Sequence, residues 1–183
     1  MDDLFDIVVI AGQSNAEGNG IKKDDKEIIS DKVFQIVDKN QIGTKELDGG
    51  KVIVDMVYPT EMVFEKAHER VDANGKKLAD FSETFAKYYI DGGYLKKGRK
   101  LLIIKTAVGG TGFARKEWGV GSILFERLNL MVDYGLSLNK DNRIVALLWH
   151  QGEHDSFENA ELNAGDRYAF YRENFKSRCL LFV

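Results

Sequence analysis

Three short segments of the sequence contain the side chains that could carry out chemistry. They are residues 12–15 (Gly-Gln-Ser-Asn), residues 109–111 (Gly-Gly-Thr) and residues 150–153 (His-Gln-Gly-Glu). A serine hydroxyl attacks an ester when a base accepts its proton and hydrogen-bond donors stabilise the oxyanion that forms. The segments supply a serine, a glycine pair, an amide and a carboxylate, so together they indicate acyl transfer.

Each of these groups has a role in that interpretation. Ser14 is the candidate nucleophile. The glycines at 109–110 can offer backbone N–H groups at close range because they carry no side chain, and Gln151 can add an amide N–H. Glu153 and Asp155 are near enough in the sequence to orient a histidine. The interpretation requires the fold to bring the three segments together.

Each segment also has an ordinary explanation when it is taken alone. Gly, Ser and Asn favour turns, and a Gly-Gly-Thr segment after a strand can be a tight turn or a loop that cradles a phosphate. His150 is expected to be a structural histidine at a strand end, and Glu153 could simply cap the helix that follows. The functional interpretation therefore depends on all three segments lying at one place.

Four apolar runs predict the strands that lead into these segments. Short continuous runs of this kind are typical of strands that are buried on both faces of a parallel sheet. The predicted strands are residues 7–11, 33–37, 101–104 and 144–149. Three of the four end at one of the chemical segments.

Helices are predicted between the strands from apolar residues spaced to share one face. The first begins near Asp80, with Ser82 as a second candidate cap, and the second begins at Ser122 and ends at Gly135. The shared face of the first helix is predicted to contain Phe81, Phe85, Tyr88 and Tyr89. That of the second is predicted to contain Ile123, Leu124, Leu128, Met131 and Val132.

The rest of the chain is less regular. A third helix is predicted over residues 159–175, and one more helix is predicted in the region 22–75, after Pro59 and Thr60. The alternation of strands and helices predicts an α/β fold with a doubly wound sheet covered on both faces. Because ligands on such sheets bind beyond the carboxyl ends of the strands, we expect the three chemical segments to meet at that edge.

The composition excludes several classes of partner. The 183 residues carry a net charge of −3, which argues against nucleic acid or an anionic membrane surface. No apolar run approaches the roughly 20 residues that span a bilayer. The acidic start at residues 1–4 is unlike a secretory signal peptide and predicts a cytoplasmic location. The lone Cys179 cannot form an internal disulfide and is expected to be a spare residue near the chain end.

Extended to residues 10–16, 107–111 and 149–155, the three segments resemble three blocks of the sialate O-acetylesterase-like branch of the SGNH hydrolase superfamily. Carbohydrate esterase family six, the acetylxylan esterases, belongs to that branch. The blocks occur in the family's order, and residues 81–86 and Trp118 also resemble the family.

The resemblance implies a fold and a reaction. Members adopt a flavodoxin-like three-layer α/β/α sandwich with a mostly parallel sheet, need no metal or cofactor, and remove acetyl groups from sugar hydroxyls. Ser14 would form an acyl-enzyme, and its own N–H, the N–H of Gly110 and the amide of Gln151 would form the oxyanion hole. Glu153 would either support the catalytic histidine or be structural.

The sequence departs from the family near its C-terminal end. The family continues into a further strand and an Asp-x-x-His motif that contains the general base, whereas no histidine follows His154 here. We therefore expect residues 1–183 to form a single, C-terminally incomplete domain that lacks its last strand, through a truncation or a frame-shifted tail, with weak or no hydrolysis. The alternatives are that His154 or His68 substitutes as the base, or that a neighbouring subunit supplies one.

The expected partner is an O-acetylated sugar or a small ester. Loss of the last strand would leave an apolar sheet edge that invites pairing between chains, so a homodimer is predicted. Two other functions stay open. One is a non-catalytic carbohydrate-binding or structural remnant of this fold, and the other is a lipase or lysophospholipase of the same superfamily.

Overall fold

The computed structural model of the protein describes residues 3–18, 30–38, 43–47, 51–55, 62–67, 70–71, 77–78 and 80–178. Its centre is a five-stranded sheet in the order β5-β2-β8-β1-β9. β2, β8, β1 and β9 are parallel, and β5 is antiparallel to β2. The strands of this sheet are β1 (Leu4–Gly12), β2 (Val33–Asp38), β5 (Met62–Lys66), β8 (Arg99–Lys105) and β9 (Arg143–His150).

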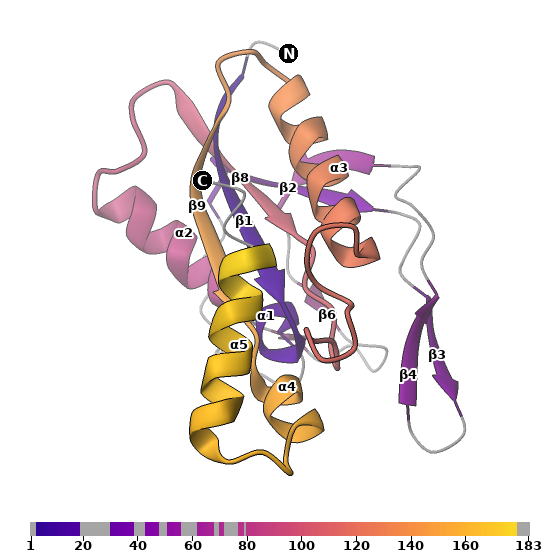
Figure 1. Cartoon of the computed structure of the whole chain (residues 1–183). Coiled ribbons are helices and arrows are strands. Elements are labelled where there is room, and N and C mark those ends of the chain that lie inside the picture. Colours follow the sequence, from indigo (N-terminus) through magenta and orange to yellow (C-terminus); the bar gives the residue numbers. More distant parts are fainter. Residues whose placement is uncertain are drawn as a thin grey trace.

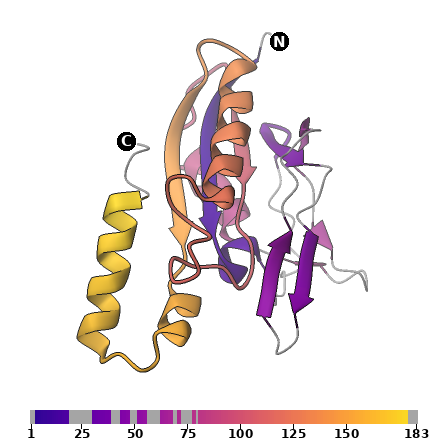
Figure 2. The same ribbon diagram turned by 45° about the vertical axis from the view of Figure 1, so that its right-hand side comes forward.

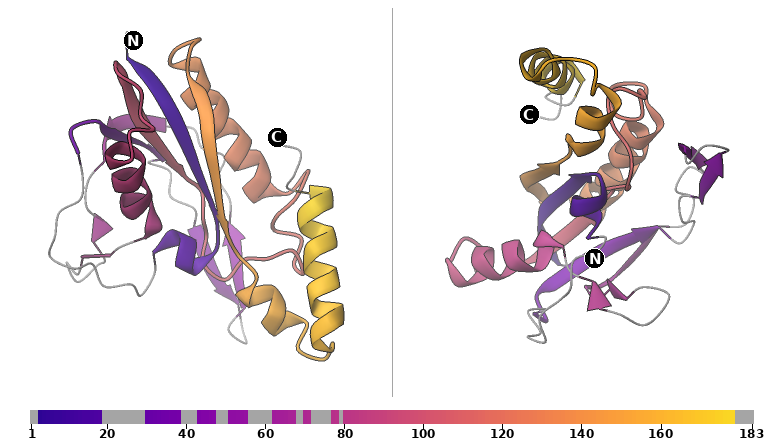
Figure 3. Two further views of the ribbon diagram at one scale, coloured as in Figure 1. Left: turned by 90° about the vertical axis from the view of Figure 1, so that its left-hand side faces the viewer. Right: turned by 90° about the horizontal axis from the view of Figure 1, so that it is seen from below.

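Helices cover both faces of the sheet (Figures 1 and 3). One face is covered by α2 (Phe81–Asp91), and the other by α3 (Ile123–Ser137) and α5 (Ala164–Arg178). The short helices α1 (Ser14–Glu17) and α4 (Glu153–Glu158) follow β1 and β9 at the carboxyl edge. The predicted α/β fold with a mostly parallel sheet is confirmed. Among the described residues, no helix combines the length and the apolar composition needed to cross a membrane.

Two small antiparallel pairs accompany the main sheet. β3 (Gly43–Leu47) pairs with β4 (Lys51–Asp55), and β6 (Arg70–Val71) pairs with β7 (Lys77–Leu78). Figure 2 shows the β3–β4 hairpin standing beside the main sheet rather than within it.

The central strand β1 explains why the molecule has three layers. Ile7 and Val9 pack into the cluster beneath α3, whereas Val8 and Ile10 pack into the cluster beneath α2. All four side chains are buried. Successive side chains of a strand point to opposite faces, so an unbroken apolar run requires an apolar cover on each side.

The four predicted strands are confirmed, but the helix predicted after Pro59 and Thr60 is wrong for the residues that the structure describes. Residues 62–66 form β5. Met62 and Phe64 pack against the core from this strand, at the period of two that a strand requires. Positions 59 and 60 themselves lie outside the described residues, as do His68 and Cys179.

The predicted start of α2 is confirmed, but its predicted face is only partly right. The Asp80 carboxylate accepts a hydrogen bond from the Ser82 backbone N–H at 2.6 Å, so Asp80 caps this helix and Ser82 does not. Phe81, Phe85 and Tyr89 pack against the core. Tyr88 is 70% exposed and belongs to the solvent side.

Two further helix boundaries differ from the predictions. The single helix predicted over residues 159–175 is two helices, α4 and α5, with a break at residues 159–163. α3 continues past Gly135, because this glycine serves packing instead of ending the helix. A Cβ at position 135 would lie 3.0 Å from Ile104 Cδ1 and 3.3 Å from Ile36 Cδ1, so the missing side chain lets α3 approach the sheet closely.

Candidate active site

The end of β1 is fixed against the end of β9. Gly12 lies opposite His150 in the parallel register, and the Gln13 N–H donates to the His150 carbonyl oxygen at 3.0 Å. Gly12 has a φ of +133°, and a Cβ there would lie 2.0 Å from that oxygen. Only glycine fits this turn, which starts α1 at Ser14.

The first and third chemical segments are joined directly. Asn15 Nδ2 donates to Glu153 Oε1 at 2.6 Å, one residue after the half-buried Ser14. The same carboxylate oxygen lies 3.4 Å from His150 Nε2. The His150 ring stacks on Phe81 with centroids 6.1 Å apart, and its side chain is 49% exposed. A serine, a carboxylate and an accessible histidine are therefore gathered at one edge.

The second segment lies against α1. The Gly109 N–H donates to Glu17 Oε2 at 2.8 Å, and the Val108 N–H donates to the Gly12 carbonyl at 3.0 Å. Gly110 has a φ of +72°, and a Cβ built there would have no atom within 4 Å. Gly110 therefore borders open space beside the first segment, as a backbone group that meets a substrate must.

Gln151 belongs to the third segment and contacts both of the others. It is buried, and its Nε2 donates to the Thr111 carbonyl at 3.1 Å and to Gln13 Oε1 at 3.4 Å. Gln13 Oε1 also accepts the His154 backbone N–H at 3.2 Å. The amide donors of Gln151 are thus directed at the protein itself, so its role as an oxyanion donor stays a prediction.

Asp155 does not share the role predicted for it with Glu153. It is buried, and its carboxylate accepts the backbone N–H groups of Phe113 at 3.0 Å and Ala114 at 2.7 Å. A Cβ at Gly112 would lie 2.6 Å from Asp155 Oδ1. The expectation that Asp155 orients a histidine is wrong, because this carboxylate holds the loop that follows the glycine pair.

The histidine proposed from the sequence as a substitute base points away from this group. His154 is 17% exposed, and its Nε2 lies 3.1 Å from Glu158 Oε1. Arg115 Nε donates to the same oxygen at 3.0 Å, and this guanidinium holds the pKa of Glu158 below its usual value. His68 lies outside the described residues. The sequence assigned His150 a structural role, yet His150 is the histidine that meets Glu153.

Two residues support the second segment, the buried Trp118 and the half-buried Glu117. The Trp118 Nε1–H donates to Thr111 Oγ1 at 2.9 Å, and that hydroxyl donates to the Val108 carbonyl at 2.7 Å. Glu117 accepts the Gly112 N–H at 2.8 Å, and burial raises the pKa of this carboxyl. Trp118 was noted in the sequence, whereas Glu117 was missed.

No sequence pattern identifies Glu17 or Glu117 as part of the site. Glu17 accepts a backbone N–H from a loop that is distant in the chain, and Glu117 accepts one from its own loop, which bends back on itself. The His150–Glu153 pair did have a signal. A glutamate that begins a helix three residues after a histidine at a strand end is close enough to turn back to it. Within the described part of the chain, no three His, Cys, Asp or Glu side chains gather as a metal site would require.

Comparisons with known proteins bear on the family and the fold of the chain. A family model described as "Carbohydrate esterase, sialic acid-specific acetylesterase" matches residues 4–177. A crystal structure of NanS aligns with a TM-score of 0.57 at 17% identity, over 96% of this chain and 63% of that chain. A protein from Arabidopsis thaliana aligns with a TM-score of 0.55 at 21% identity, over 93% of this chain and 68% of that one. The comparison with curated proteins gives no match.

Proposed function

Because the chain belongs to the carbohydrate esterase family of sialic acid-specific acetylesterases, we propose that it hydrolyses acetyl esters of O-acetylated carbohydrate with Ser14 as the nucleophile. The chain spans 63% of the length of the NanS structure, so the proposal rests on its own residues. The observation that carries it is the Asn15–Glu153 hydrogen bond, which joins two of the three chemical segments next to Ser14.

The proposed reaction has two steps. Ser14 Oγ attacks the acetyl carbonyl, and its proton passes to a base and then to the departing sugar oxygen. Water attacks the acetyl-serine in the second step, which releases acetate and restores the hydroxyl. The backbone N–H groups of Ser14 and Gly110 are the proposed donors to the oxyanion, since Gly110 borders open space.

We assign proton transfer to His150, supported by Glu153. An N–H on the Nε2 that faces Glu153 would donate to the carboxylate and leave Nδ1 as the basic nitrogen. The charge of Glu153 would then stabilise the imidazolium as it forms. Asn15 and Phe81 support this arrangement by holding the carboxylate and the ring.

Acetate release from O-acetylated sialic acid, acetylated xylan and an aryl acetate tests the proposal and ranks the substrates. The Ser14→Ala variant should lose activity at least about a thousandfold. Ser156→Ala is the matched control, because this exposed serine lies on α4, outside the three chemical segments. Unchanged turnover in Ser14→Ala, or sugar binding without any acetate release by the wild type, would contradict the proposed esterase.

The base is tested separately with two histidine variants. His150→Gln should slow acetylation of Ser14 by about a hundredfold or more. His154→Gln should leave this rate unchanged, because its ring faces Glu158. Full activity in His150→Gln alongside loss in Ser14→Ala would reject His150 and retain the nucleophile.

A further inference from the structure

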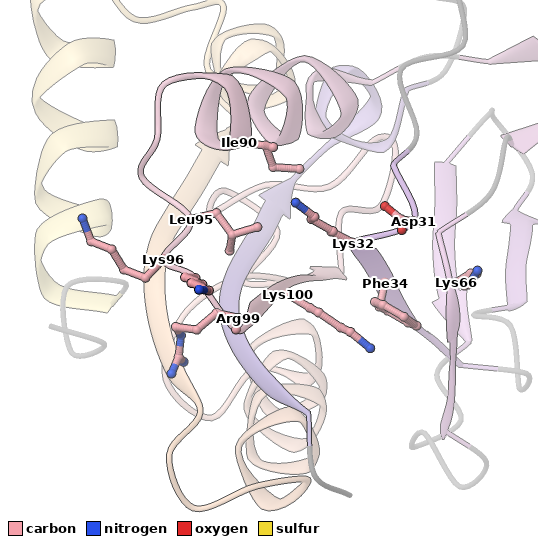
Figure 4. A pocket seen from close by; sticks show the side chains of 11 residues that line it. Asp31, Lys32, Phe34, Lys66, Ile90, Leu95, Lys96, Arg99 and Lys100 are labelled. Atoms are coloured by element: carbon pink, nitrogen blue, oxygen red, sulfur yellow. The ribbon is translucent and has the colours of Figure 1, made fainter.

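We propose that a second site, at the opposite edge of the sheet, binds a small anion carrying several negative charges, such as a diphosphate or a phosphate ester. A cavity of about 610 Å³ lies there, lined by the end of β5 and by the segments that lead into β2 and β8 (Figure 4). Among the described residues, its lining contains one carboxylate, Asp31. The described lining contains six cations, namely Lys32, Lys66, Lys96, Lys97, Arg99 and Lys100.

Two of these cations are already neutralised by carboxylates. Arg99 Nε donates to the buried Asp6 at 2.6 Å, and Lys100 Nζ donates to Asp3 at 2.7 Å. Both hold the wall of the cavity in place. The positive charge of the cavity that is not neutralised must therefore come from other lining residues.

Lys32, Lys96 and Lys97 supply that charge. All three are exposed, and none lies within 4.0 Å of a carboxylate oxygen of the described residues. Of the lining residues that the structure describes, Asp31 is the one carboxylate that opposes them. Positively charged side chains that line a concave surface create a positive potential that attracts small anions.

The backbone beneath these lysines is fixed. The Leu101 N–H donates to the Lys32 carbonyl at 2.9 Å, and the Arg99 N–H donates to the Lys96 carbonyl at 3.1 Å. Gly98 closes this turn with a φ of +82°, and a side chain there would have open space but a strained backbone. The lysine side chains are therefore presented from a rigid frame, which lowers the ordering cost of binding.

The remaining wall is apolar and sets the size of the ligand. Phe34, Ile90 and Leu95 form it, and Lys100 Nζ lies 5.0 Å from the centre of the Phe34 ring. A cavity of this volume suits a small molecule. Lysine acts as a point charge that suits phosphate oxygens, whereas the net charge of −3 on the whole chain disfavours a long polyanion.

The site is separate from the proposed ester chemistry. Lys32 and Arg99 lie at the amino ends of parallel strands, whereas Ser14 follows the carboxyl end of β1. A ligand bound at this cavity should not compete with an ester substrate. The inference therefore does not depend on the proposed function.

Calorimetric titration of the whole chain with pyrophosphate tests the inference, with inorganic phosphate and acetate compared at equal ionic strength. We expect one saturable site for pyrophosphate, weaker binding of phosphate and none of acetate, with affinity falling as salt is added. The Lys96→Glu/Lys97→Glu variant should bind at least about tenfold more weakly. Lys140→Glu/Lys176→Glu is the control, because it changes the net charge equally at residues outside the cavity.

Three results would overturn the inference. The first is titration without saturation in the wild type, and the second is equal weakening in both double variants, which would reveal only a general effect of charge. The third is much tighter binding of a single-stranded oligonucleotide that is lost in Lys96→Glu/Lys97→Glu, which would assign the site to nucleic acid. Circular dichroism and an unchanged midpoint of urea denaturation should confirm that each variant is folded.

Discussion

Position 12 shows how one residue sets the geometry of the candidate active site. Gly12 combines a left-handed φ of +133° with direct contact against the backbone of His150. The left-handed φ disfavours any residue with a side chain, and the contact with His150 leaves no volume for one. Because Ser14 follows two residues later, the direction of its hydroxyl depends on this glycine.

We therefore expect Gly12→Ala to lower the free energy of unfolding by about 3 kcal/mol or more, measured by urea denaturation. Gly93→Ala is the matched control. Gly93 also has a left-handed φ, of +73°, but a Cβ there would have no atom within 4 Å, so only the backbone cost of about 1 kcal/mol applies. Equal losses in the two variants would show that the contact with His150 adds nothing.

The two carboxylates that follow the His-Gln-Gly segment divide their roles for a geometric reason. Glu153 and Asp155 are two residues apart on α4, and such residues point to different sides of a helix. Glu153 reaches Asn15 and His150, whereas Asp155 turns inward to the loop at residues 113–114. Closeness in the sequence therefore did not predict a shared partner.

At the scale of the elements, a buried carboxylate ties the amino ends of three strands together. Asp6 on β1 accepts from Arg99 Nε on β8 at 2.6 Å and from Arg143 Nε on β9 at 2.7 Å. The Tyr89 hydroxyl on α2 donates to it at 3.0 Å. Burial alone would raise the pKa of Asp6, but the hydrogen bonds from Arg143, Arg99 and Tyr89 outweigh it and hold the pKa below its ordinary value of 3.8.

A lowered carboxyl pKa contributes stability above the unfolded value, and that stability is lost as the pH falls below about 3.8 towards the folded pKa. We expect Asp6→Asn to reduce the free energy of unfolding by about 3 kcal/mol at pH 7. The difference from the wild type should shrink in acid, where Asp6 is itself neutral.

Urea denaturation at pH 7 and at several pH values below 4 measures this effect. Asp141→Asn serves as the control, because Asp141 is 57% exposed and pairs with Lys140 at the surface. Its effect should stay within about 0.5 kcal/mol at every pH. A deficit in Asp6→Asn that does not change with pH would show that packing, rather than charge, is the source.

At the scale of the whole molecule, β9 is an edge strand of the main sheet. The described strands pair β9 with β1 and with no other strand. Ile144 is 42% exposed on it, while the side chains of the neighbouring β1 are almost all buried. A strand edge of this kind offers unpaired backbone groups to another chain.

We expect the chain to dimerise through this edge, and light scattering coupled to size-exclusion chromatography measures it. Ile144→Lys should shift the population towards the monomer, since a lysine opposes edge pairing. Leu130→Lys is the control, because Leu130 is 38% exposed on α3, away from the edge. A monodisperse monomer of the wild-type chain at working concentration contradicts the prediction.

The sequence by itself determined the strands, the type of fold and the meeting of the three chemical segments. The run at residues 7–11 is apolar at every position, and such a run can be satisfied only between two covered faces. Once the strands are parallel, their carboxyl ends share one edge. Residues 12–15, 109–111 and 150–153 therefore had to come together, and the family resemblance in those segments is confirmed.

Only the tertiary structure decided which groups within that edge are partners. Contacts such as those of Glu17 with Gly109 and of His150 with Glu153 depend on side-chain directions and loop paths. The local sequence pattern does not encode side-chain directions or loop paths. The predicted helix boundaries were wrong for the same reason. Gly135 was predicted as a helix end because glycine is a poor helix former, yet close packing against Ile104 keeps it within α3.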